Sequence, residues 1–245
     1  MPDRFPAPDR TALLVRRRYR ALGIVALGGL LLSWEIVARL GWVPVLFLPS
    51  PVGVLAETWD MLASGELFVH LAASLKRLVA GFAIGGALGV SVGIAVGFFS
   101  VADAVGTPVI AATFPVPKIA VIALGVFFPM AINTATGVRQ ADPLLVRAAV
   151  SFGARRWSLV RKVILPSALP MIFAGLRLGA GTALLLLVAA EMIAVESGVG
   201  FLILHAGNIM ATTKLMVGIV VLSVLGVLSH WGLNVLERAA IPWRT

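Results

Sequence analysis

Cysteine is absent from this chain of 245 residues, and only 13% of the residues are charged. Without cysteine, disulfides, thiolate metal sites and cysteine nucleophiles are excluded. The histidines lie far apart with no second ligand at metal-binding spacing, so no metal site is expected. The chain has neither a G-x-x-x-x-G-K-S/T loop nor a nucleophile elbow. It is therefore predicted to hydrolyse no ATP itself, to be no enzyme, and to need no cofactor.

The low content of charged residues is accompanied by a high content of apolar residues. They make up 60% of the chain, and the mean hydropathy is +1.02. A soluble domain carries roughly a quarter charged residues. Runs such as 178–195 and 216–228 are apolar on every side and approach the roughly 20 residues that cross a bilayer. These features predict an all-α, polytopic integral membrane protein in contact with lipid on its outer surface.

The positive charges, which give a net charge of +9, are unevenly placed. One group precedes the first apolar run, and a second lies between Arg139 and Lys162. Basic segments beside spans are typical of cytoplasmic loops, so both segments and both termini are predicted to be cytoplasmic. Nucleic-acid binding is not expected, because no recognition motif or set of stacking aromatics accompanies the basic residues.

Proline, glycine and charged residues mark boundaries that divide the chain into four parts. They are a cytoplasmic tail (1–20), a first span with an external loop and a short surface helix (21–65), a membrane core (66–238) and a C-terminal tail (239–245). Within the core we expect spans at 66–99, 119–138, 169–195 and 215–236, and loops at 142–166 and 196–214.

Glycine recurs at every fourth position of the span that ends near residue 99. On a helix these residues form one flat stripe against which a second helix can pack closely. A sliding interface and static packing both fit the stripe, and static packing is favoured. The stripe consists of Gly81, Gly85, Gly89, Gly93 and Gly97.

Several polar residues fall inside predicted spans. Glu191 is a candidate for a functional group, and the alternative is a structural pair with Arg77, Lys76 or a partner chain. Asn133 could line a pathway, although such residues more often bond neighbouring helices. Glu35 and Arg39, four residues apart, are expected to pair with each other.

The loop at 142–166 has a regular pattern. Asp142-Pro143 is a helix start, with a capping side chain before a proline at the first helical position. Gly153 is expected to end that helix, and a second basic stretch then runs to Leu165-Pro166. Two short helices with an exposed apolar ridge would form a docking site for protein or for lipid headgroups. One face of the first helix carries Leu144, Leu145, Ala148, Ala149 and Phe152.

Here the sequence resembles a known family. Arg147-Ala148-Ala149, Gly153 and Val163-Ile164-Leu165-Pro166 are similar, in residues and spacing, to the "EAA" loop of permease subunits of binding-protein-dependent ABC importers. Other short motifs resemble those of the sulfonate/nitrate/taurine branch of this family. The resemblance covers the chain from Leu48 to about Arg238. These motifs are Leu48-Pro49-Ser50-Pro51, Ser74-Leu75-Lys76-Arg77, Phe127-Phe128-Pro129, Val138-Arg139, Gly153-Ala154-Arg155-Arg156-Trp157 and Ala189-Ala190-Glu191-Met192.

The resemblance implies a type I importer permease fold of about five to six spans in a bacterial inner membrane. It also implies a second permease copy, a dimer of cytoplasmic ATPases and an external substrate-binding protein. The small anionic solute of this branch would tolerate Arg77 or Arg177 near its path. The alternatives are a secondary transporter or channel without an ATPase, and an intramembrane enzyme. The residues expected to couple to the ATPase are Leu144, Leu145, Arg147, Ala148, Ala149, Phe152, Gly153, Leu165 and Pro166.

Two departures from the family pattern stand out. Arg147 occupies the usual position of a glutamate, which removes or reverses any ionic contact made there. A further apolar stretch of about one span, roughly 20 residues, is missing near Ala120. Charge placement indicates the same fault, because two cytoplasmic segments need an even number of crossings between them and only three good spans are visible. Either a segment is lacking, which we favour, or 101–117 is a re-entrant half-span, or the chain is a defective variant.

Overall fold

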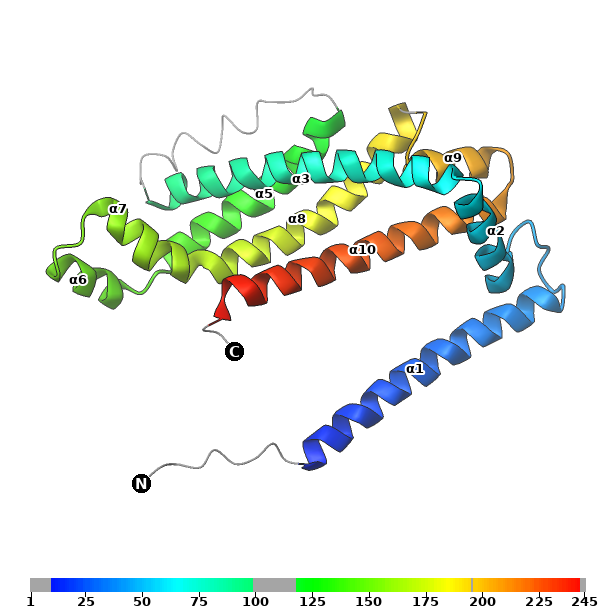
Figure 1. Ribbon diagram of the computed structural model, residues 1–245, viewed down its shortest axis with the longest axis horizontal. Helices are drawn as coiled ribbons and strands as arrows, with labels where there is room; N and C mark the ends of the chain where they lie inside the picture. Colours follow the sequence, from blue (N-terminus) through cyan, green and yellow to red (C-terminus); the bar gives the residue numbers. More distant parts are fainter. Residues whose placement is uncertain (1–9, 99–117, 195, 243–245) are drawn as a thin grey trace.

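The computed structural model describes residues 10–98, 118–194 and 196–242, and these residues form helices and no strand. Figure 1 shows a bundle of long helices with short helices at its two ends. Helices α6 (Pro143–Ser151) and α7 (Arg156–Leu159) lie at one end, and α2 (Pro51–Ala63) and α9 (Val199–Asn208) lie at the other. The long helices of the bundle are α3 (Glu66–Phe98), α5 (Lys118–Arg139), α8 (Leu165–Ala194) and α10 (Thr212–Ala240).

Four helical stretches in the described part of the chain are long and apolar enough to cross a membrane. They are 66–98, 119–139, 156–193 and 212–240. Helix α1 (Arg10–Arg39) is 30 residues long and runs away from the bundle in Figure 1. It meets α2, where Glu35 Oε2 accepts a hydrogen bond from the amide of Val52 at 3.2 Å. The expected pair of Glu35 with Arg39 is confirmed.

The glycine stripe lies directly against α5. A Cβ on Gly81 would meet Ile122, and one on Gly97 would meet Val138, so the two helices run side by side in the same direction. The expected close packing is therefore present. Two parallel helices place the end of α3 and the start of α5 at opposite ends of the bundle. The alternatives for 101–117 concern residues outside the described part.

Pro129 lies inside α5 and cannot donate a backbone hydrogen bond to the carbonyl of Gly125. The Oγ1 of Thr182 on α8 donates to that carbonyl at 2.9 Å. A membrane offers no water to satisfy such a group, so the contact joins α8 to α5 at the point where the proline interrupts the ladder.

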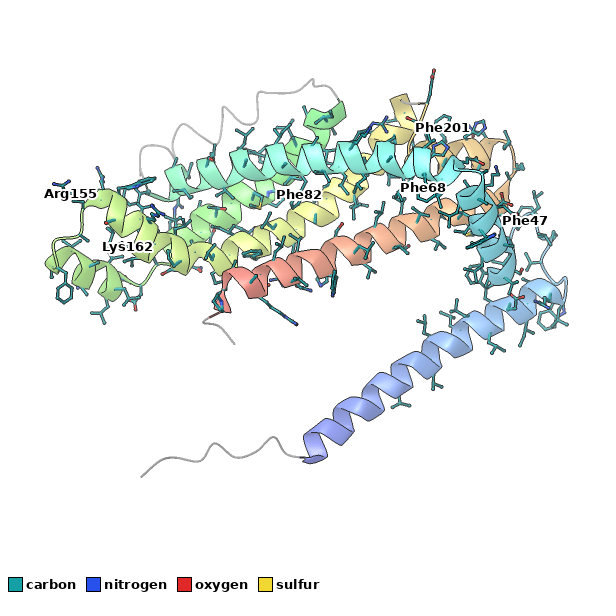
Figure 2. The ribbon with its side chains drawn as sticks, viewed as in Figure 1. Phe47, Phe68, Phe82, Arg155, Lys162 and Phe201 are labelled. Carbon is teal, nitrogen blue, oxygen red and sulfur yellow. The ribbon has the colours of Figure 1, made fainter. Side chains whose placement is uncertain are left out.

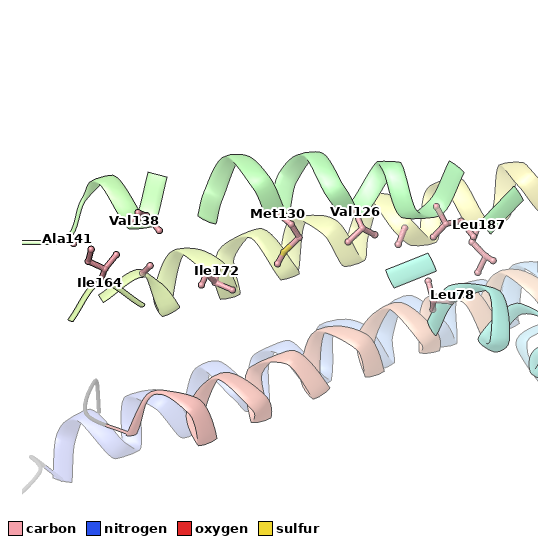
Figure 3. Close-up of a cluster of buried hydrophobic side chains, with 11 residues drawn as sticks. Leu78, Val126, Met130, Val138, Ala141, Ile164, Ile172 and Leu187 are labelled. Carbon is pink, nitrogen blue, oxygen red and sulfur yellow. The ribbon is translucent and has the colours of Figure 1, made fainter. Parts of the chain in front are cut away.

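Apolar side chains fill the space between α3, α5 and α8 (Figure 3). Ile122, Val126 and Met130 of α5 are fully buried, and Leu187 of α8 is buried with them. The cluster continues to Val138, Ala141 and Ile164, which lie where the bundle meets the loop of α6 and α7. The core of the bundle is therefore continuous with the base of that loop.

One predicted loop is wrong. The segment 196–214 was expected to be a loop, but it contains α9 and the start of α10, because Val199, Leu202 and Ala206 are buried against neighbouring helices. Helix α1 begins at Arg10, before its apolar part, and so includes the second half of the predicted tail at 1–20. The short surface helix expected after Pro51 is confirmed as α2.

Candidate functional site

The loop of α6 and α7 begins with a strong local signal. The Oδ1 of Asp142 accepts a hydrogen bond from the amide of Leu144 at 2.8 Å, and Pro143 occupies the first helical position. Gly153 ends the helix with φ +78°, a conformation that residues with a Cβ rarely adopt. The amide of Ala154 donates to the carbonyl of Ala149 at 3.0 Å and completes the turn. The helix start at Asp142 and its stop at Gly153 are both confirmed.

Six exposed residues form two adjacent rows on α6, and we call them the α6 outer face. One row is Leu144, Arg147 and Ser151, and the other is Leu145, Ala148 and Phe152. Residues three and four apart share a helix face, so the two rows make one continuous surface. Phe152 is 91% exposed and Leu144 is 71% exposed. Large apolar side chains left this open mark an interaction surface.

The opposite side of α6 holds the helix to the bundle. Val146 packs against the buried core cluster, and Ala149 is half-buried. Ala149 therefore lies apart from Ala148, with which sequence periodicity had grouped it on one face. A 100° turn per residue separates the two alanines.

The second arm of the loop differs from the prediction. The helix was expected to end at Leu165-Pro166, but α7, the π-helical turn η1 (Val160–Ile164) and α8 form one unbroken helix from Arg156 to Ile193. In η1 the amide of Leu165 donates to the carbonyl of Val160, five residues back. This wider turn accommodates the ring of Pro166, which would otherwise collide with the preceding turn of an α-helix.

At the other end of the bundle, Glu191 is buried, with 1% of its surface exposed. Its carboxylate accepts hydrogen bonds from Arg77 Nη1 at 2.8 Å, from Ser74 Oγ and from the amide of Gly200 at 3.0 Å. Arg77 also donates to the carbonyl of Ser197 at 2.8 Å. Of the partners weighed for Glu191, the structure selects Arg77, while Lys76 is exposed.

The first residues of α9 complete this arrangement, which we call the Glu191 cluster. The amide of Gly198 donates to His70 Nδ1 at 3.1 Å, and that of Val199 donates to Ser74 Oγ at 2.8 Å. A Cβ on Gly198 would lie 2.4 Å from Cδ of Glu191, so only glycine fits there. The cluster thus fixes the turn between α8 and α9 to α3.

Sequence reasoning missed three members of the cluster: Ser74, His70 and Gly198. One signal was available, since Ser74 and Arg77 lie three residues apart and share a helix face. Asn133 does not join the cluster, because its side chain donates to the carbonyl of Pro129 in its own helix. Arg177 is paired with Glu237 of α10.

Comparison with known proteins decides the family. Residues 93–241 match the model of the family described as "Binding-protein-dependent transport system inner membrane component". The chain belongs to this family. It is a permease subunit of a binding-protein-dependent ABC importer, with the all-helical type I permease fold. Membership implies an ATPase and a substrate-binding protein as partners, and a place in the membrane.

Curated relatives cover nearly all of the permease. "Putative aliphatic sulfonates transport permease protein SsuC" of Bacillus subtilis is 36% identical over 94% of this chain and 90% of its own length. The protein of that name from Escherichia coli is 37% identical over 88% and 89%. "Taurine transport system permease protein TauC" of Escherichia coli is 36% identical over 92% and 90%.

The alignment with the Bacillus subtilis protein also bears on the missing stretch. It runs over 248 positions but takes in 94% of the 245 residues, which is about 230, so about 18 positions have no counterpart in this permease. That difference approaches the length of one span, roughly 20 residues.

Proposed function

We propose that the permease couples ATP hydrolysis to import through the loop at 142–166, with the α6 outer face seated in a groove of the ATPase. The observation that carries this proposal is the exposure of Leu144, Leu145 and Phe152 on a helix whose ends are both fixed by local structure. In this assignment Gly153 sets the angle between α6 and α7, and Leu165 and Pro166 lie where the loop becomes the span. A movement of α7 would reach the outer end of the membrane without a break, because α7, η1 and α8 form one helix.

The same loop sets the orientation. Arg147, Arg155, Arg156, Arg161 and Lys162 lie at the end of the bundle that carries α6 and α7, and Figure 2 marks Arg155 and Lys162 there. Phe47, Phe68 and Phe201 lie at the opposite end (Figure 2). With the basic end inside, both termini are cytoplasmic, and α2, α9 and the Glu191 cluster face the outside.

A second copy of the permease is part of the proposal. The space between α3, α5 and α8 is filled by apolar side chains, which is no path for a charged solute. A water-lined path for a small anion is therefore expected between two copies. The relatives named for aliphatic sulfonates and taurine favour a sulfonate-type anion as that solute.

The test is association with the ATPase. The detergent-solubilised permease carries a tag, and the ATPase that is purified with it is identified by mass spectrometry. We expect Phe152→Asp to abolish co-purification of the ATPase, because a charge would enter the apolar contact. Trp59→Asp serves as the control, since Trp59 is also an exposed aromatic (72%) but lies on α2 at the opposite end. An ATPase that stays bound to Phe152→Asp would contradict the proposal and favour a transporter that needs no ATPase.

A further inference from the structure

Arg147 stands within the α6 outer face, in the row between Leu144 and Ser151. The structure describes every residue from 143 to 190, and this stretch contains no aspartate or glutamate. Two carboxylates at the same end of the bundle are already engaged elsewhere: Asp142 caps α6, and Glu237 pairs with Arg177. The outer face thus presents a fixed positive charge among apolar side chains.

The distance from the membrane favours a protein over lipid as the partner of this face. The helix from Arg156 to Ile193 has 38 residues and is about 57 Å long at 1.5 Å per residue. The hydrocarbon core is about 30 Å thick, and a helix tilted by about 20° needs only slightly more than that length to cross it. If the core reaches from Glu191 to about Met171, Arg156 lies about 22 Å beyond it. Helix α6 lies beside this extension: Leu145 lines one cavity with Lys162 and Pro166, and the C-terminal end of α6 joins α7 at the far end (Figure 1).

We propose that Arg147 selects the ATPase by charge, and that the groove receiving α6 carries an aspartate or glutamate opposite this guanidinium. This inference rests on the proposed docking of the α6 outer face. A guanidinium enclosed by an apolar contact loses water and needs an anionic partner, so a groove with a basic or neutral residue at this place would be rejected. Arginine also binds a carboxylate through two parallel hydrogen bonds, which fixes the register of α6 in the groove.

The experiment measures the affinity of the full-length permease, in detergent, for the ATPase that is purified with the wild type. We expect Arg147→Glu to weaken binding by about tenfold or more, because two like charges would meet in the contact. Arg238→Glu is the matched control, since Arg238 is exposed on α10 near the same end and the net charge changes equally. A screen of ATPase variants should then restore binding to Arg147→Glu by replacing a single acidic residue with lysine or arginine.

The other outcomes separate this inference from the proposed function. If Arg147→Glu binds as well as Arg238→Glu while Phe152→Asp binds no ATPase, selection by charge is wrong and docking stands. If Phe152→Asp and Arg147→Glu both bind as the wild type does, docking itself is wrong. If Arg147→Glu leaves ATPase binding unchanged but lowers binding to vesicles containing phosphatidylglycerol, the face is a lipid-binding surface and the inference is overturned.

Discussion

Charged residues are buried at one end of this permease and exposed at the other. At the end proposed to face outward, called the outer end below, Glu191 and Arg77 are withdrawn from solvent, and hydroxyl and backbone groups of α3, of α9 and of the turn between α8 and α9 complete their hydrogen bonds. At the end proposed to face the cytoplasm, called the inner end below, Arg147 and Phe152 are exposed on a short helix and at its C-terminal cap. The buried charges of the outer end are therefore satisfied within the chain, whereas the exposed residues of the inner end are proposed to be covered by the ATPase. We therefore expect substitutions in the Glu191 cluster to lower the stability of the permease. Substitutions in the α6 outer face, at the inner end, are expected to weaken binding to the ATPase.

The largest expected effect is that of Glu191→Ala. This substitution leaves Arg77, Ser74 and the amide of Gly200 without their shared acceptor in a buried site. Removal of one partner from a buried ion pair costs about 3–5 kcal/mol, and we expect a loss of that order in thermal unfolding in detergent. Glu196→Ala is the control, because Glu196 is exposed just beyond the same helix. Equal stability of the two variants would refute the idea that the Glu191 cluster stabilises the outer end.

A smaller loss is expected within the bundle that joins the two ends. In Gly85→Ala the new Cβ would lie 2.2 Å from the carbonyl oxygen of Ala123, and overpacking of this kind costs about 1–3 kcal/mol. Gly86→Ala is the matched control, because a Cβ there has no neighbour within 4 Å. Thermal unfolding of both variants would measure the difference. A similar loss in Gly86→Ala would show that the backbone freedom of glycine matters rather than the contact with α5.

The smallest effect on stability is expected at the inner end. Phe152→Ala removes a side chain that is 91% exposed, so the free energy of unfolding should change by no more than about 0.5 kcal/mol. The same variant should bind the ATPase much more weakly than the wild type. Unfolding and pull-down of one preparation would check both points. A variant that is destabilised as strongly as Glu191→Ala would mean that Phe152 packs within the permease, and the contrast between the two ends would be lost.

Much of the architecture could be predicted from local sequence. A helix that is apolar on every face is stable only in lipid, so runs of about 20 apolar residues predict membrane-spanning helices. Asp142-Pro143 and Gly153 fix the bounds of α6 because a capping side chain and a positive φ act within a few residues. The glycine stripe predicts a close neighbour because its period matches that of the helix.

Only the tertiary structure decided which distant groups meet. Glu191 lies 114 residues from Arg77 in the chain, and nothing local to either residue selects the other. Helix α9 forms because its apolar side chains are buried by α3, α8 and α10, although its short sequence reads as a loop. The unbroken helix through Pro166 depends on a π-helical turn that sequence rules for proline do not anticipate. Local chemistry thus set the long apolar helices and the ends of α6, while packing over long chain separations set α9 and the partners of the buried charges.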